Sequence, residues 1–429
     1  MKRILGAMAI LATVLTSSEG MAKTLEDVLK EKGVISEADY KDVTKTKPLN
    51  YKLGEGFTLT SPDEKFSTTI TSHLQLRYTL MDLDDVNNTA TKQAQDSSKF
   101  ELRRIRLFFN GYAYSKDLTY RLVINFANSQ NPSNSNGLLE ETYMNYRLLD
   151  ELQFRFGQDK VPFGRQFITQ SSAQQFVDSS MVTVAFVPGV DTGVMLHGKI
   201  GGGLVNYNIG GYGGVGQNTF RSTSDNAFAA RITFNPLGDM KYSEADLENS
   251  PKPLISMGAN FYRNTLNGSE ANNLSFAGGK GWYKIGNSIH PAAKKISGDE
   301  AVDFNTAGFD AAFKWRGFSA QGEYFLGQAD GQTSKNIARA EGFYAQAGYF
   351  VIPDTLEIAA RYSYLDPNRD VTNDHWVEST GAVSWYIRKH FLKLQTDYTN
   401  VHKQTAIAST SGKNSTDDQQ VRFQAQLMF

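Results

Sequence analysis

Apolar and polar residues alternate along most of this chain from Lys65 onward. In the stretch 65–81, Phe66, Ile70 and Leu74 stand at apolar positions, and Thr69 and His73 stand between them. A period of two places one set of side chains on each face of a β-strand. The pattern predicts sixteen strands, near 65–81, 99–114, 117–128, 138–149, 152–161, 191–200, 204–213, 226–235, 254–264, 302–315, 317–328, 341–352, 355–365, 376–387, 390–400 and 419–429.

The connections between these segments alternate between tight turns and long polar stretches. One connection, 236–253, should be short by this rule and is long. Short turns at one end and long loops at the other are typical of an up-and-down outer-membrane barrel. We therefore predict an all-β fold, a 16-stranded antiparallel transmembrane β-barrel over 61–429 with both termini on the periplasmic side. A soluble β-sandwich also alternates, but sixteen segments in series favour the barrel.

The N-terminal region differs from the rest. Basic residues at 2–3, an apolar core at 4–15 and small residues at 20 and 22 predict a secretory signal peptide over 1–22. A membrane anchor is the alternative, but the core is too short to span a bilayer. In 23–60 we predict a periplasmic helical segment and linker: Ser36 and Asp39 form a capping pattern, and Gly33 is placed to end a first helix. We expect export to the outer membrane of a Gram-negative cell.

Composition narrows the possible functions. The chain has 27 Phe, 20 Tyr and 37 Gly on a polar background, which does not suit disorder. It has no Cys, which excludes disulfide scaffolds, thiolate metal sites and Cys nucleophiles. After the N-terminus no apolar run is long enough for a membrane-spanning helix. The formal charge of −1 gives no global field for nucleic acid, so we expect no nucleic-acid partner.

Three motifs support a family resemblance. The stretch 100–106 (FELRRIR) with 111–127, the G-x-x-K-x-P-F-G pattern of 157–164, and the DTGVMLHG of 191–198 resemble the phosphate-selective porin O/P family. The motifs cover about 100–215. The resemblance implies a sixteen-stranded, trimeric, anion-favouring porin whose third long loop folds into the barrel. In this chain that loop is 162–190, and it is the candidate constriction; an ordinary surface loop is the alternative.

If the apolar face of each strand meets lipid, the other face lines the lumen. This assignment gives twelve basic lumen positions against six acidic ones, and in the first five strands six basic residues against Glu141 alone. Arg103 falls on the lipid face, where it would snorkel. We predict as pore-lining, anion-binding candidates from this assignment Arg77, Arg104, Arg106, Arg121, Arg147 and Arg155. The family resemblance adds Lys160, which matches the lysine of the K-x-P-F-G motif, and the candidate constriction loop adds Arg165.

Four of the candidates are expected to form a compact cationic patch, because Arg104 and Arg106 share one face of a strand and Arg77 and Arg121 face inward on the two flanking strands. The alternative is that these arginines pair with Glu141 and with wall hydroxyls and only solvate the lumen.

The sequence favours an outer-membrane diffusion porin with a modest preference for anions such as phosphate or other oxyanions. We expect small anionic solutes and outer-membrane lipid as partners, a homotrimer, no enzyme activity, no catalytic residues and no cofactor. No metal is expected, because the six histidines lack ligand spacing. Two alternatives stay open: a barrel sleeve that houses a partner such as an electron-transfer protein, and an outer-membrane hydrolase that uses His73.

Overall fold

The structure is a computed structural model that describes residues 25–44, 49–52, 54–83, 96–127, 138–221, 223–272, 276–289, 296, 299–404 and 415–429. The expected signal peptide over 1–22 lies outside the described residues. No helix in the described ranges is long and apolar enough to cross a membrane.

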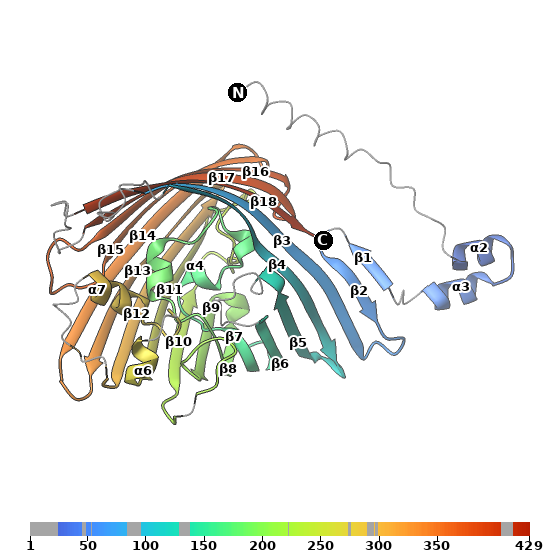
Figure 1. The fold of residues 1–429 in the computed structure, drawn as a ribbon. Coiled ribbons are helices and arrows are strands. Elements are labelled where there is room, and N and C mark those ends of the chain that lie inside the picture. The colour runs from blue at the N-terminus through green and yellow to red at the C-terminus, as the bar shows by residue number, and fades with distance from the viewer. Residues whose placement is uncertain are drawn as a thin grey trace, which may run out of the picture.

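Sixteen antiparallel strands form a closed barrel, as predicted (Figure 1). Each strand pairs with the next along the chain, and β18 pairs with β3 to close the ring. The strands are β3 (Phe66–Asp82), β4 (Ser97–Ala113), β5 (Ser115–Asn125), β6 (Leu139–Leu149), β7 (Leu152–Lys160), β8 (Val190–Ile200), β9 (Val205–Tyr212), β10 (Ala227–Phe234), β11 (Leu254–Leu266), β12 (Val302–Trp315), β13 (Phe318–Gly331), β14 (Ile337–Ile352), β15 (Leu356–Asp366), β16 (Trp376–Arg388), β17 (Leu392–Gln404) and β18 (Ser415–Met428).

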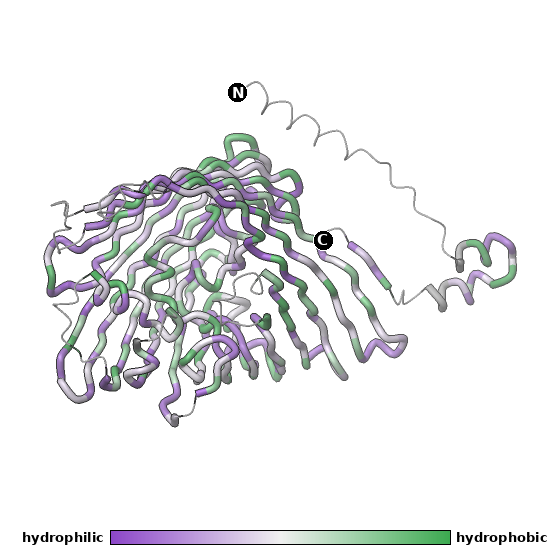
Figure 2. The backbone as a smooth tube through the Cα atoms, in the orientation of Figure 1, coloured by the Kyte–Doolittle hydropathy of each residue, from purple (hydrophilic) through white to green (hydrophobic). Residues whose placement is uncertain are grey.

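The closing strand carries its apolar residues on the outside. Phe423 lies opposite Tyr78 and Leu427 opposite Leu74, and both Phe423 and Leu427 are exposed. The backbone of Phe429 continues the ladder, because its N–H and C=O pair with Ser72. Figure 2 shows the same interleaving of hydrophobic and polar residues along the other strands. The sequence period of two is thus the division between an outer and an inner face.

The N-terminal segment contains two short helices, α2 (Leu25–Glu31) and α3 (Glu37–Thr44). Ser36 caps the second helix: its Oγ accepts from the N–H of Asp39, whose carboxylate accepts from the N–H of Ser36. Gly33 has a positive φ of 66° and ends the first helix, as expected.

A hairpin follows where a linker was predicted. Its strands β1 (Leu49–Lys52) and β2 (Gly56–Thr60) pair with each other, and β2 pairs with the first residues of β3. The signal was present but short, since Leu49 and Tyr51 alternate with polar residues, as do Phe57 and Leu59.

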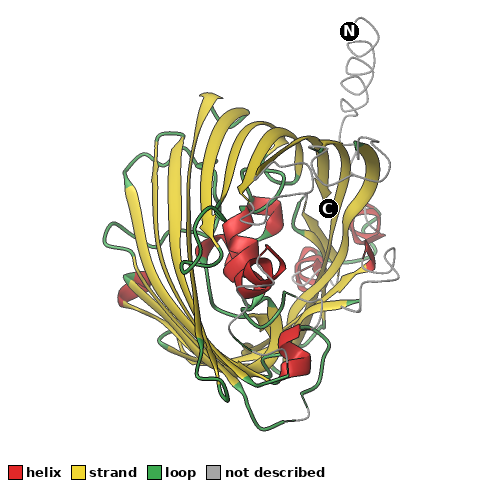
Figure 3. Cartoon of the chain, turned by 60° about the vertical axis from the view of Figure 1, so that its left-hand side comes forward, coloured by secondary structure: helices red, strands yellow, loops and turns green. Residues whose placement is uncertain are grey.

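Three connections fold into the barrel, where Figure 3 shows helices within the ring of strands. The constriction loop, 161–189, contains α4 (Arg165–Ile168), the 3₁₀ turn η3 (Ser171–Ala173) and α5 (Met181–Phe186). The helical loop between β11 and β12 contains α6 (Gly268–Asn272) and α7 (Gly281–Ile289). The inner turn, 235–253, is the connection that was expected to be short and is long. It folds back into the lumen.

An apolar core fills one side of the barrel interior. Trp282 of α7 is fully buried and stacks near Phe186 of the constriction loop, with ring centroids 6.3 Å apart. Phe186 in turn stacks on Phe325 of β13 at 5.4 Å, and Phe304 of β12 lies against Trp282. This core attaches the constriction loop to the β12–β13 wall and leaves the opposite wall, β4 to β8, facing the passage.

Candidate functional site

The constriction loop is fixed at its start by a carboxylate of the far wall. Glu323 on β13 accepts hydrogen bonds from the backbone N–H groups of Arg165 at 2.5 Å and Gln166 at 2.7 Å. The first N–H groups of a helix have no partner within the helix, so an acceptor there stabilises α4. Further on, Ser180 caps α5 by accepting from the N–H of Thr183.

The middle of the loop runs along β15 to β18. Lys393 donates to the carbonyl of Gln174 at 2.9 Å, and Arg361 donates to the carbonyl of Asp178 at 2.9 Å. The prediction that this loop folds inward is confirmed, and the surface-loop alternative is wrong for this structure.

A β-bulge in β4 corrects the assignment of Arg103. Gln75 lies opposite Arg104 but Leu76 lies opposite Leu102, so Arg103 is the extra residue. The bulge lets neighbouring residues both point inward, and Arg103 approaches Asp178 of the constriction loop at 3.8 Å. The sequence held a signal for this, because the apolar positions switch from even to odd between Leu102 and Ile105.

Most of the predicted arginines are paired with carboxylates, so the expected patch is interrupted by negative charge. Arg77 donates to Asp178 at 2.8 Å. Arg106 lies 2.7 Å from Glu140, Arg121 lies 2.5 Å from Glu141, and Arg155 lies 2.5 Å from Asp159.

Two of these carboxylates were missed in the sequence. Asp159 has the same strand parity as Arg155, so extending that parity would have found it. Glu140 faces inward beside Glu141 because of a second register shift, where Ile124 lies opposite Leu139 and Leu122 opposite Thr142. The prediction that Glu141 is the single acid of the first five strands is therefore wrong.

Two candidates keep an uncompensated charge. Arg104 donates to the side chain of Gln75 at 2.7 Å, and Lys160 donates to the carbonyls of Phe167 at 2.7 Å and Thr169 at 3.0 Å. Within the described ranges neither forms an ion pair. Five other cations at the constriction, Arg77, Arg103, Arg106, Arg121 and Arg155, each lie within 4 Å of a carboxylate, so Arg104 and Lys160 differ from them in this respect.

Two other candidates lie elsewhere. Arg147 lies at the short-turn end, where its side chain is 46% exposed and bound to Asp117 and Asp150. Arg165 is only 2% exposed and donates to Ser256 on the far wall, so it does not line the passage. The prediction that Arg165 lines the passage is therefore wrong. Arg165 belongs to α4, and its side chain points to the far wall rather than toward the passage.

Asp178 carries the negative charge of the constriction loop closest to the arginines. Burial raises the pKa of Asp178, but the positive charges of Arg103, Arg77 and Arg104 outweigh this and hold the pKa well below its usual value. The carboxylate therefore stays ionised and keeps its contacts with Arg77 and Arg103.

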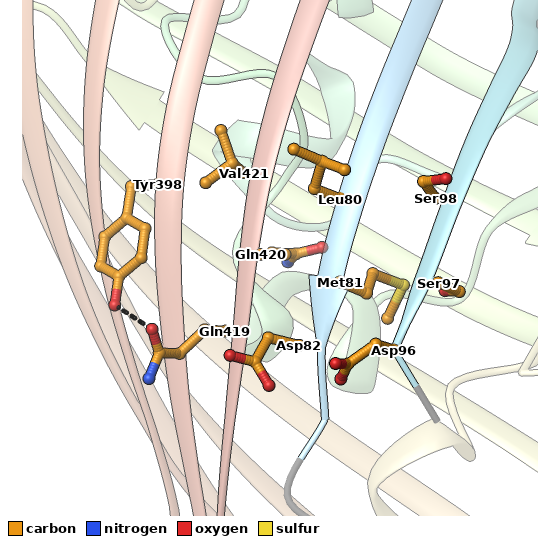
Figure 4. Close-up of a pocket in the computed structure, with 10 residues that line it drawn as sticks. All are labelled: Leu80, Met81, Asp82, Asp96, Ser97, Ser98, Tyr398, Gln419, Gln420 and Val421. Atoms are coloured by element: carbon orange, nitrogen blue, oxygen red, sulfur yellow. Dashed lines mark hydrogen bonds between the residues drawn. The ribbon is translucent and has the colours of Figure 1, made fainter. Parts of the chain in front are cut away.

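A cavity of about 450 Å³ lies at the long-loop rim between β17, β18, β3 and β4 (Figure 4). Its charged lining residues are Asp82 and Asp96, and Tyr398 donates to Gln419 across its edge at 2.9 Å. Among the described residues its lining holds two carboxylates and no cationic side chain, so these residues do not favour an anion. In the described part of the chain no cluster of three His, Asp or Glu residues could hold a metal.

Comparisons with known proteins agree with this architecture. An uncharacterized protein of Aquifex aeolicus strain VF5 is 25% identical in an alignment of 430 positions, which spans 92% of this chain and 93% of that protein. The outer-membrane channel DcaP of Acinetobacter baumannii matches 87% of this chain and all of its own, with a TM-score of 0.55 at 14% identity. An anion-selective porin from Comamonas acidovorans matches 85% of this chain and all of its own, with a TM-score of 0.54 at 10% identity.

At these identities the solved structures establish the fold alone. The family assignment comes from a separate match, in which the model for phosphate-selective porins O and P covers residues 73–429, the whole barrel except the start of β3. Together with the closed sixteen-stranded barrel and its inward loop, this match identifies an outer-membrane channel. The chain belongs to the family of phosphate-selective porins O and P.

Proposed function

We propose that this channel is a passive diffusion porin with a modest preference for anions such as phosphate or other oxyanions. The observation that carries the proposal is the charge excess at the constriction, where Arg104 and Lys160 have no ion-pair partner in the described ranges. In water-filled space one charge acts on another with only about 1 kcal/mol at 4 Å. Two uncompensated charges therefore support a preference rather than strict selection.

The contents of the lumen favour a channel over a sleeve for a partner protein. The constriction loop, the inner turn and the helical loop occupy the interior that a partner would need. The hydrolase alternative rests on His73, whose ring contacts the amide of Gln426 at 3.3 Å. A serine hydrolase requires a hydroxyl beside its histidine, and no described serine hydroxyl is bonded to His73.

The test is reconstitution in planar bilayers, with the zero-current potential measured across a KCl gradient. We expect the wild type to favour chloride, and the pair Arg104→Gln and Lys160→Gln to shift the potential toward potassium. Lys116→Gln, at the exposed start of β5, with Lys335→Gln, in the exposed connection between β13 and β14, removes the same charge and should leave the potential unchanged. Absence of any current would contradict the channel itself, and an unselective wild type would contradict the anion preference.

The remaining expectations also belong to this proposal. We also propose assembly as a homotrimer, contact of the apolar outer face with outer-membrane lipid, and cleavage of residues 1–22 on export. Native-gel mass of the detergent-extracted protein and N-terminal sequencing of the mature chain test the first and the last.

A further inference from the structure

A cavity at the constriction has a lining that differs from the rest of the polar lumen. This eyelet pocket has a volume of about 220 Å³ and lies between the β5–β9 wall, the constriction loop and the inner turn. Its lining residues are Arg121, Glu141, Tyr143, Arg155, Asp159, Lys160, Pro162, Ile168, Gln170, Met195, Asn208 and Tyr242. We infer that it binds a small monocarboxylate with an aromatic or other apolar body. The inference rests on the proposed channel function and specifies its solute class.

Lys160 supplies the anion end of the pocket. An ammonium group has three N–H donors, and two of those of Lys160 are used by the carbonyls of Phe167 and Thr169. One donor and the whole positive charge therefore remain for a solute. The side-chain amides of Gln170 and Asn208 also line the pocket, and neither forms a side-chain hydrogen bond within the described ranges. These groups can bind the two oxygens of one carboxylate.

The other cations of the pocket are already neutralised and held in place. Arg121 pairs with Glu141 at 2.5 Å and lies 5.1 Å from the ring centre of Phe108. Arg155 pairs with Asp159 at 2.5 Å and lies 4.2 Å from the ring centre of Tyr143. Such pairs leave little charge to bind a second anionic group. The pocket therefore suits a single negative charge better than a multiply charged anion.

The apolar part of the lining comes from separate segments. Pro162 and Ile168 belong to the constriction loop and Met195 to β8, while Tyr242 reaches the pocket from the inner turn. A passage that only selected charge would need no such surface, because hydrated ions gain nothing from apolar contact. A solute with a ring or branched chain gains from it, and the volume is below the range typical of drug-sized ligands.

The inner turn is what completes this pocket. Tyr242 is held beneath Arg165, whose guanidinium centre lies 5.0 Å from the tyrosine ring centre. Arg165 was expected to bind anions directly; here it positions an aromatic side chain from the inner turn against the pocket. The sequence alone could not predict this contact, because the two residues lie 77 positions apart and belong to connections at opposite ends of the barrel.

The experiment measures current through single channels in KCl with benzoate, acetate or phosphate added to one side. We expect benzoate to interrupt the current at concentrations at least ten times lower than acetate or phosphate, since acetate lacks the apolar body. Lys160→Gln should weaken the benzoate effect about tenfold, as expected for losing one charge-assisted hydrogen bond. Ile168→Ser should weaken benzoate but leave acetate unchanged.

Lys335→Gln is the matched control, because it removes a lysine from the exposed connection between β13 and β14, which does not line the eyelet pocket. Conductance in KCl alone shows whether the constriction loop stays inserted in each variant. If Lys160→Gln changes this conductance, the inference is tested instead by comparing benzoate with acetate in Ile168→Ser. Equal action of benzoate and acetate on the wild type would overturn the inference, as would full benzoate sensitivity in both variants. Ion conduction without any benzoate effect would support the proposed channel function and refute only the inference about monocarboxylates.

Discussion

Glu244, on the inner turn, joins this turn to the constriction loop. Its carboxylate is buried and accepts from the side chain of Gln166 at 2.9 Å and from the backbone N–H of Gln175 at 2.7 Å, both on the constriction loop. Its own N–H donates to the carbonyl of Ala173 at 3.1 Å. We predict that Glu244→Ala releases the constriction loop.

The size of the effect follows from the two charge-assisted bonds to the loop. Each contributes roughly 1.5–3 kcal/mol, so their loss destabilises the inserted loop by at least about 3 kcal/mol. A change of 1.4 kcal/mol is tenfold in an equilibrium. The displaced loop should thus become on the order of a hundredfold more populated.

Single-channel recording is the assay. We expect Glu244→Ala to show larger conductance and frequent open-channel fluctuations, because an inward loop limits the open cross-section. Glu248→Ala is the control: this residue lies on the same segment with the same charge, but it is exposed and pairs with Lys241 at 2.7 Å. Wild-type conductance and current noise in a folded Glu244→Ala barrel would refute the reasoning.

Three further predictions concern the passage, the closing strand and the inner core. Asp178→Asn should raise chloride selectivity, because Arg77 and Arg103 lose their carboxylate; an unchanged zero-current potential would contradict this. Since the folded pKa of Asp178 is depressed, its stabilising contacts are complete above about pH 4 and are lost only as the pH falls through the lower folded value, so titration from pH 7 to 5 should not release them. Deletion of Phe429 removes the last pairing with β3 and should lower the amount of barrel in the outer membrane, measured by immunoblot of membrane fractions; normal amounts would exclude a role in assembly. Trp282→Ala should cost about 3–5 kcal/mol of packing and expose the helical loop to protease while the strands stay protected, and equal protease resistance of that loop would argue against the core.

The strands were predictable because their signal is local. In each of the sixteen alternating segments the apolar residues indicate which face points outward, and the structure contains all sixteen strands. The site was harder to predict, because assigning side chains to a face by counting alternate residues assumes a strand ladder without bulges. At Arg103 and at Glu140 the ladder has an extra residue, so neighbours share a face. Each shift changed which charges meet.

Contacts between distant connections were beyond any local pattern. The length of 236–253 identified it as unusual, but the position of Tyr242 beside Lys160 and Ile168 depends on how two loops from opposite ends of the barrel meet. Likewise Arg165 could be placed on the correct loop but not on the correct side of it, since α4 sets that side through its contact with Glu323.

The apolar core inside the barrel divides its interior into two kinds of surface. Along β12 and β13, side chains such as Phe304 and Phe325 are fully buried on the inner face, while Phe309 and Tyr324 on the same strands are exposed outside. Substitutions on this inner face should obey the rules of a soluble protein core, where lost volume is destabilising. Across the lumen, on β4 to β8, inward side chains such as Arg121 and Glu141 are polar or charged, so a substitution there changes the charge of the passage rather than the volume of an apolar core. Variation in solute preference can therefore arise on one half of the wall while the other half maintains the fold.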